Sequence, residues 1–119
     1  MIDRLRRLFT RATDDRGVRP TVDAATGVQL VRDGATLLDV RERDEWRAGH
    51  APQAVHVPLA DVPTVGPQRL EDGATVVVVC ASGMRSRTAA RQLRALGYAA
   101  TSLSGGLGAW QAAGGSVRP

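Results

Sequence analysis

The residues best suited to chemistry in this sequence lie in one short segment, residues 75–88 (TVVVVCASGMRSRT). Its four consecutive valines, 76–79, predict a strand that is buried on both faces, as in the middle of a parallel sheet. Cys80 follows this strand directly, and five residues separate it from Ser86, where we expect a helix to begin. Because sites in open α/β sheets form at the carboxyl ends of the strands, the sequence places a thiol where a site is expected.

The loop after Cys80 has the residue types of a cradle for an anion. A tight curl points several backbone N–H groups inward, and the start of the helix adds unpaired N–H groups and its positive dipole end. Gly83 permits the backbone angles of such a curl, Arg85 supplies a permanent cation, and Ser86 can cap the helix and offer a hydroxyl to the sulfur. Such surroundings lower the pKa of a thiol, ordinarily about 8.5, by one to several units. The alternative is a buried structural cysteine, and the order of residue types favours the reactive thiolate.

The composition excludes several other kinds of site. The 119 residues suffice for one domain. A single cysteine excludes an internal disulfide, a Cys-x-x-Cys redox pair and a multi-cysteine zinc site, and two histidines cannot form a metal site alone. We therefore expect no metal and no cofactor. Two Trp, one Tyr and one Phe are too few for a nucleic-acid stacking platform, and no apolar run approaches the roughly 20 residues of a membrane span.

The positive charge is concentrated near the N-terminus. All 16 basic residues are arginine, and six of them lie in residues 1–20 with three aspartates, which leaves ten arginines against nine acids in the rest of the chain. We expect residues 1–16 to be an arginine-rich extension, with an amphipathic helix over residues 1–12 and a linker over residues 13–17. We expect residues 17–119 to be a cytoplasmic domain without the basic face of a DNA-binding protein.

Strand and helix patterns alternate along the domain. Asp23 is placed to cap the first helix, and Gly34, Gly49 and Gly97 to end helices. In the helix that follows Cys80, we expect Leu96 to face inward with the other apolar residues. This alternation predicts an α/β fold, a mostly parallel central sheet of about five strands with helices on both faces. Helices are predicted over residues 24–32, 42–48, 86–96 and 105–113, and strands over residues 36–40, 54–57, 76–79 and 100–103.

Four segments in order resemble the rhodanese family of sulfurtransferases, over about residues 18–114. The segment CASGMRS at residues 80–86 resembles the family's active loop, written C-R-S-G-x-R-S. The other three are LDVRE at 38–42 followed by Glu45 and Trp46, GHAP at 49–52 followed by Ala54 and Pro58, and LSGG at 103–106 followed by Trp110. The resemblance implies a rhodanese-like fold.

The resemblance also implies a mechanism. Cys80 would take the outer sulfur of a donor such as thiosulfate to become a persulfide, and cyanide or a thiol would then remove it, in two half-reactions. The donor and acceptor are small molecules or a persulfide-carrying protein. The loop residues that would hold the transferred sulfur are Ala81, Ser82, Gly83, Met84, Arg85 and Ser86.

One loop position departs from the family pattern, because Ala81 stands where many members have a charged residue. One loop cation is therefore missing, and this favours a persulfide over dianionic thiosulfate as the donor. Asp39 and Arg41, at the end of a predicted strand, are expected either to support the loop or to form a structural cap or ion pair.

The two histidines, the two tryptophans and one pair of glycines also have expected structural roles. We expect His50 to be structural and His56 to be an exposed strand residue, and we expect Trp46 and Trp110 to be core anchors. The pair at 105–106 predicts a tight strand-to-helix turn near the loop.

Three other functions compete with sulfur transfer. The domain could be a non-catalytic binding or adaptor module, or a single-thiol redox sensor. A phosphatase or arsenate reductase carries an arginine six places after its cysteine, but here that place holds Ser86, and Arg85 lies five places on. The loop is thus one residue shorter, which suits a single sulfur better than a phosphate.

Overall fold

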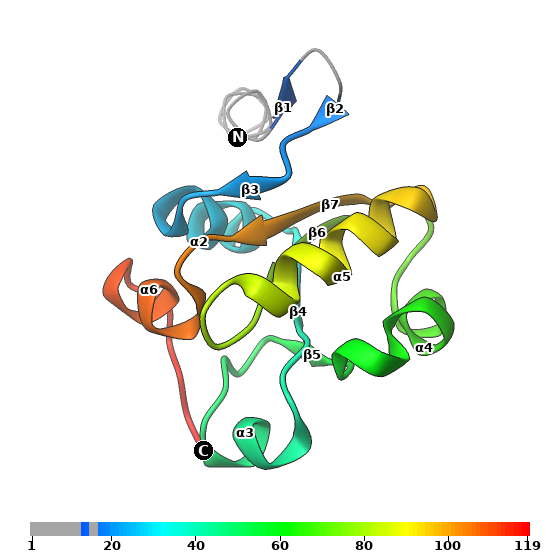
Figure 1. Cartoon of the computed structure of the whole chain (residues 1–119). Helices are drawn as coiled ribbons and strands as arrows, with labels where there is room; N and C mark the ends of the chain where they lie inside the picture. The colour runs from blue at the N-terminus through cyan, green and yellow to red at the C-terminus, as the bar shows by residue number, and fades with distance from the viewer. Residues whose placement is uncertain (1–12, 15–16) are drawn as a thin grey trace.

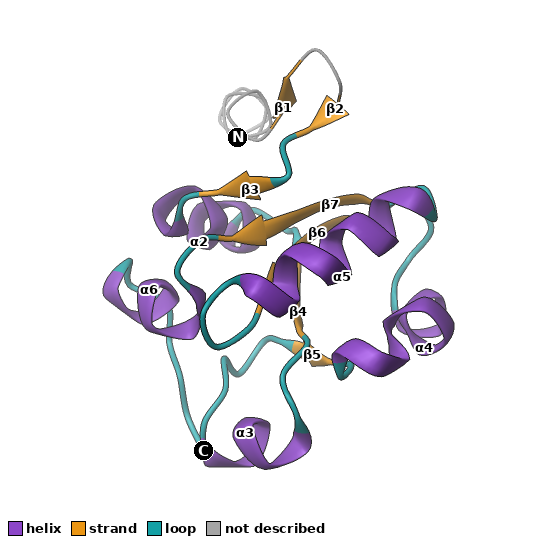
Figure 2. Cartoon of the chain, in the orientation of Figure 1, coloured by secondary structure: helices purple, strands orange, loops and turns teal. Residues whose placement is uncertain are grey.

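The computed structural model describes residues 13–14 and 17–119, and its centre is a parallel sheet of five strands in the order β3-β7-β6-β4-β5 (Figure 1). Helices cover both faces, which confirms the predicted fold class (Figure 2). The strands are β3 (Thr21–Val22), β4 (Thr36–Asp39), β5 (Val55–His56), β6 (Thr75–Val79) and β7 (Ala99–Leu103). The helices are α2 (Ala24–Arg32), α3 (Arg43–Ala48), the 3-10 turn η1 (Leu59–Asp61), α4 (Val62–Arg69), α5 (Met84–Ala95) and α6 (Gly106–Ala112).

Strand β6 is the middle of the core, as its valines predict. Val76 and Val78 face a cluster that includes α4 and α5, whereas Val77 and Val79 face a second cluster that includes α2 and α6. All four are fully buried. Burial of a valine side chain contributes about 1.5–3 kcal/mol, so this strand anchors the residue that follows it, Cys80.

Helices α2 and α5 begin in different ways. Helix α2 begins as predicted, because the Asp23 carboxylate accepts the Thr26 N–H at 2.7 Å. Helix α5 begins at Met84, two residues earlier than predicted, after Gly83 in the left-handed conformation (φ +107°). The expectation that Ser86 caps this helix was wrong, because Ser86 lies in its first turn and its hydroxyl donates to the Gly83 carbonyl at 3.1 Å.

The far end of α5 also differs from the prediction. Leu96 is 50% exposed and does not face the core, whereas Ala89, Ala90 and Leu93 are buried as predicted. The helix ends one residue before Leu96, so that Leu96 no longer follows the helical period, and Gly97 then takes a left-handed conformation.

Helix α4 was not predicted. Pro63 lies in its first turn and Pro67 lies inside it, and two prolines so close together conceal a helix from pattern analysis. Its buried residues, Val62 and Gly66, face α5, where a Cβ on Gly66 would lie 3.6 Å from Leu93 Cδ2.

The N-terminal region carries a short hairpin where a linker was expected. Strand β1 (Thr13–Asp14) pairs antiparallel with β2 (Gly17–Val18). The helix predicted over residues 1–12 lies outside the described residues. Within the described part of the chain, no helix has the length and apolar character needed to cross a membrane.

Candidate active site

Cys80 lies at the carboxyl end of β6 and is fully covered, and its sulfur is the meeting point of the loop that follows. The Gly83 N–H donates to Sγ at 3.0 Å, and the thiol donates to Ser86 Oγ at 3.4 Å. The loop holds only residues 81–83 before α5 begins, so the backbone must curl around the sulfur. The Gly83 N–H and the Ser86 hydroxyl therefore lie against the side chain of Cys80, and the anion cradle stays a prediction.

The turn between β7 and α6 packs against this loop. Gly105 and Gly106 both take left-handed conformations, φ +85° and +69°, as the predicted tight turn requires. The Leu107 N–H donates to the Cys80 carbonyl at 2.9 Å, and a Cβ on Gly106 would lie 2.0 Å from the Ala81 carbonyl oxygen. The loop and the start of α6 are thus in close contact, and a side chain at Gly106 would displace the loop.

Opposing effects act on the pKa of the Cys80 thiol. Burial raises it, whereas hydrogen bonds from the Ser86 hydroxyl and from the N–H groups of Ser86, Gly83 and Ser82 lower it. The hydrogen bonds together outweigh burial, so the pKa of Cys80 lies below its ordinary value. Because the donors are main-chain groups and a buried hydroxyl, their effect does not depend on a mobile side chain.

A second hydroxyl extends this network. Ser102 of β7 is fully buried, and its Oγ lies 2.6 Å from Ser86 Oγ. A chain of three atoms therefore runs from the Cys80 sulfur through Ser86 to Ser102. No motif in the sequence marks Ser102, because it is 16 residues from Ser86 and meets it only where α5 packs on β7.

Arg85, the predicted cation of the loop, has a carboxylate partner. Its two terminal nitrogens donate to the two carboxylate oxygens of Glu45 at 2.7 and 3.0 Å, and both side chains are about one-third exposed. The hydrogen bond from Arg85 is the main reason that the pKa of Glu45 falls to about 2, and the same bond raises the pKa of Arg85. Glu45 was noticed in the sequence only as part of a motif, so this pairing was missed.

Asp39 and Arg41 bind each other, so of their expected roles the structure shows the ion pair. Arg41 Nη2 lies 2.8 Å from Asp39 Oδ2, with both side chains buried. The same guanidinium donates to the carbonyls of Gly49 at 2.7 Å and Glu45 at 3.3 Å. Arg41 therefore binds the middle and the C-terminal end of α3, and Glu45 of this helix in turn holds Arg85.

Three aromatic side chains form a stack beside α3. Trp46 lies between His50 and His56, with ring centroids 3.5 and 4.6 Å away. His50 Nδ1 lies 2.7 Å from the Trp46 carbonyl, and His56 Nε2 lies 2.7 Å from the Arg41 carbonyl, so the structural role expected of His50 holds. Two expectations were wrong: Trp46 is only half-buried and not a core anchor, and the stack leaves His56 half-buried instead of exposed. Trp110, by contrast, is 1% exposed, as expected.

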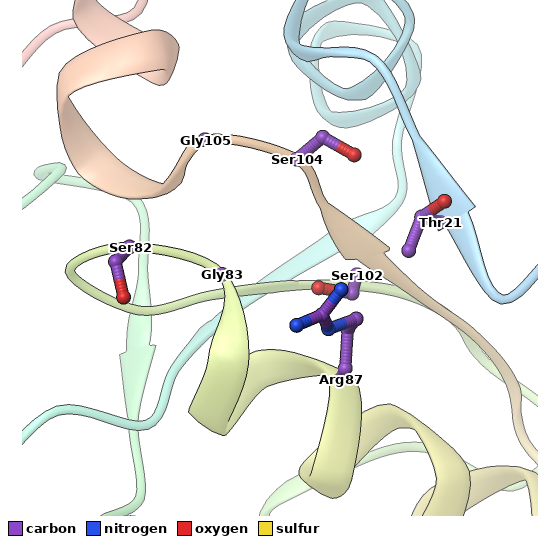
Figure 3. Close-up of a pocket in the computed structure, with 7 residues that line it drawn as sticks. All are labelled: Thr21, Ser82, Gly83, Arg87, Ser102, Ser104 and Gly105. Carbon is purple, nitrogen blue, oxygen red and sulfur yellow. The ribbon is translucent and has the colours of Figure 1, made fainter.

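A small pocket of about 110 Å³ lies beside the loop (Figure 3). It opens between the beginning of α5, strands β3 and β7, and the turn before α6, and Cys80 is not among its lining residues. In the described part of the chain, no group of three or more His, Cys, Asp or Glu side chains is arranged to hold a metal ion. The pocket is lined by Thr21, Ser82, Gly83, Arg87, Ser102, Ser104 and Gly105.

Comparison with known proteins gives consistent matches. Residues 24–113 match the family model of the rhodanese-like domain. A Bacillus subtilis protein described as "Putative sulfurtransferase YtwF" is 37% identical over 75 residues, which are 63% of this chain and 72% of that protein. Another, "Putative sulfur carrier protein YrkF", is 37% identical over 62 residues, 52% of this chain but only 33% of that protein. The solved rhodanese-like domain of an Anabaena protein has a TM-score of 0.74 and 30% identity, with 85% of this chain and 80% of that one covered.

Proposed function

This chain belongs to the rhodanese-like domain family, as its motifs predict, and on that premise we propose that it is a sulfurtransferase that carries sulfane sulfur on Cys80. The observation that supports this most strongly is the convergence of loop N–H groups and the Ser86 hydroxyl on a single sulfur. These donors favour a thiolate, and the thiolate is the nucleophile in sulfur chemistry. The catalytic unit we propose is residues 17–119.

In the first half-reaction, the Cys80 thiolate attacks the outer sulfur of the donor. The bond between that sulfur and the rest of the donor breaks, and its electron pair leaves with the departing group, which is sulfite for thiosulfate or a thiolate for a persulfide. Cys80 then carries a persulfide. We propose that the N–H groups of the loop, residues 81–86, hold its terminal sulfur anion.

The hydroxyl groups of Ser86 and Ser102 can reorient when the Cys80 thiol loses its proton. In the thiol form, the Ser86 hydroxyl donates to the Gly83 carbonyl. When the thiol has lost its proton to solvent, rotation of the Ser86 hydroxyl points its hydrogen at the sulfur, and the Ser102 hydroxyl, 2.6 Å away, can donate to Ser86 Oγ. The network therefore offers hydrogen bonds to sulfur in both protonation states.

In the second half-reaction, a nucleophilic acceptor attacks the terminal sulfur of the persulfide. Cyanide gives thiocyanate, a thiolate gives a new persulfide, and in both cases the Cys80 thiolate leaves with the electrons of the broken S–S bond. The donor product departs before the acceptor reacts, so we expect ping-pong kinetics. No second cysteine is present to divert the persulfide into an internal disulfide.

The loop favours a persulfide over thiosulfate as the donor. Arg85 is paired with Glu45, and position 81 is an alanine, so neither loop position offers an unpaired cation to a dianion. The similarity to a protein described as a sulfur carrier is consistent with a persulfide-carrying protein as partner. A cytoplasmic location stays a prediction.

Intact-protein mass spectrometry tests the proposal. We expect incubation with a persulfide donor, or more slowly with thiosulfate, to add the mass of one sulfur atom, and cyanide to remove it as thiocyanate. Cys80→Ser should abolish both steps while the protein stays folded. Absence of the added sulfur from all donors would favour the adaptor, and oxidation of Cys80 by peroxide without sulfur transfer would favour the redox sensor.

A further inference from the structure

Arg87 is a cation beside the loop that has no partner among the described residues. It lies in α5, two residues after Arg85, and is exposed. Arg85 forms an ion pair, but Arg87 forms no hydrogen bond or ion pair with any residue that the structure describes. Its side chain rises from α5 toward Ser102 and Thr21 of the neighbouring strands, at the pocket described above (Figure 3).

The rest of the pocket is rich in hydroxyl groups and contains no acidic side chain. Thr21, Ser82 and Ser104 line it, and within the described chain none of their hydroxyls is in a hydrogen bond. A guanidinium with adjacent free hydroxyls is a combination that binds carboxylate or sulfonate oxygens. The volume of about 110 Å³ suits such a small group, since a water molecule occupies roughly 30 Å³ in the liquid.

The pocket is adjacent to the reactive sulfur but separate from it. Ser102 lines the pocket, and its hydroxyl is connected to the Cys80 sulfur through Ser86, by contacts of 2.6 and 3.4 Å. Ser82 and Gly83 contribute both to the pocket and to the loop around the sulfur. The pocket and the loop around the sulfur therefore share residues, and the start of α5 borders both.

We propose that this pocket is a subsite for the carboxylate or sulfonate group of a small thiol substrate, held by Arg87 and the neighbouring hydroxyls. This inference rests on the proposed sulfurtransferase function. The anionic thiol acts as acceptor: its thiolate sulfur attacks the terminal sulfur of the Cys80 persulfide, a new S–S bond forms, and the Cys80 thiolate leaves. The reverse reaction makes the persulfide of the same thiol a donor. Arg87 does not touch the reacting sulfur, so it sets specificity only.

The first test is direct binding, which requires no sulfur transfer. We expect methanesulfonate to shift the backbone NMR signals of Gly83, Ser104 and Gly105 in the full chain, and uncharged dimethyl sulfone, of similar shape, to leave them in place. Arg87→Gln should remove the shifts. Arg91→Gln is the matched control, because Arg91 is an exposed arginine one turn further along α5 and does not line the pocket. Retained shifts in Arg87→Gln, or equal shifts with the sulfone, would overturn the proposal.

The second test compares two acceptors that differ in charge, 3-mercaptopropionate and its amide. We expect Arg87→Gln to slow discharge of the persulfide to the carboxylate about tenfold, since the carboxylate loses a charge-assisted hydrogen bond from the guanidinium. In Arg87→Gln, the rate of discharge to the amide should change less than about twofold. In Arg91→Gln, the rates of discharge to both acceptors should change less than about twofold, because salt screens an exposed charge outside the pocket. Equal losses for both acceptors, or equal effects of both variants, would contradict the subsite. If the protein takes up no sulfur, the proposed function fails, but the binding test still decides whether the pocket exists as an anion site.

Discussion

Two neighbouring strands of this domain are followed by polar segments with opposite electrostatic character. After β4, residues 39–49 hold one buried carboxylate, Asp39, one buried guanidinium, Arg41, and a short helix, and these two buried charges are paired with each other. After β6, N–H groups of residues 80–86 and the Ser86 hydroxyl lie against one sulfur. The first segment pairs its two buried charges with each other, whereas the second gathers donors around a group that is neutral as a thiol and anionic as a thiolate.

This difference indicates that residues 39–49 have a structural role and that residues 80–86 have a chemical one. A buried ion pair such as Asp39–Arg41 has no capacity left for a ligand, and it serves to hold α3 in place. Donors around Cys80 are fully used only when the sulfur is negatively charged, which is the state that attacks a donor. The two segments meet through Glu45 and Arg85, so the scaffold also positions the helix that carries the loop's arginine.

The largest expected effect is on stability and comes from breaking the ion pair in residues 39–49. Asp39→Ala leaves the buried Arg41 guanidinium without its carboxylate, and we expect the free energy of unfolding to fall by about 3–5 kcal/mol. Asp44→Ala, at an exposed position on α3, is the control and should be nearly neutral. Urea denaturation followed by circular dichroism measures both. A small loss in Asp39→Ala would mean that the ion pair is not what holds α3.

An intermediate effect is expected from a change in residues 80–86, and it should fall on activity more than on stability. Ser86→Ala removes a hydroxyl that lowers the pKa of Cys80, and we expect sulfur loading at neutral pH to slow by about tenfold or more, as for a hydrogen bond to a charged group. The free energy of unfolding should fall by only about 1 kcal/mol. Thr88→Ala, in the same helix, is the control. Unchanged loading kinetics in Ser86→Ala would assign Ser86 a purely structural role.

The smallest effect is expected at the contact between the segments. Because the folded pKa of Glu45 is about 2 and its ordinary value is 4.5, the Arg85–Glu45 pair stabilises the fold fully above about pH 4.5, and this contribution is lost as the pH falls toward 2. Partial exposure limits it to less than about 1 kcal/mol. Glu45→Gln should therefore be slightly less stable than the parent at pH 6 and converge with it near pH 2, as measured by urea denaturation. A constant difference over that range would show that the ion pair is not responsible.

Local patterns predicted much of the fold, and contacts between distant residues account for what they missed. The valine run, the Asp23 cap and the glycines at helix ends are local signals, and the strands and helices that they predict are present. Helix α4 was missed because Pro63 and Pro67 disguise it. The start of α5 was placed late because Gly83 begins it by its backbone conformation, without a side-chain cap.

The same distinction applies to the site. Cys80 and its loop were predicted because the strand, the cysteine and the helix are consecutive. The pairing of Arg85 with Glu45 spans 40 residues, and the contact between Ser86 and Ser102 spans 16, so neither follows from a local pattern. The carboxylate partner of Arg85 was therefore not predicted, and Arg87, which has no partner among the described residues, became apparent only with the strands in place.

The central claim is that the hydrogen bonds of the loop favour the thiolate form of Cys80 and so lower the pKa of its thiol. The rate of alkylation by iodoacetamide as a function of pH tests it most directly, because the chain has no other cysteine. We expect the rate to reach half its maximum at a pH below the ordinary thiol value of about 8.5, and at a higher pH in Ser86→Ala than in the parent. A midpoint at or above the ordinary value in the parent protein would contradict the account.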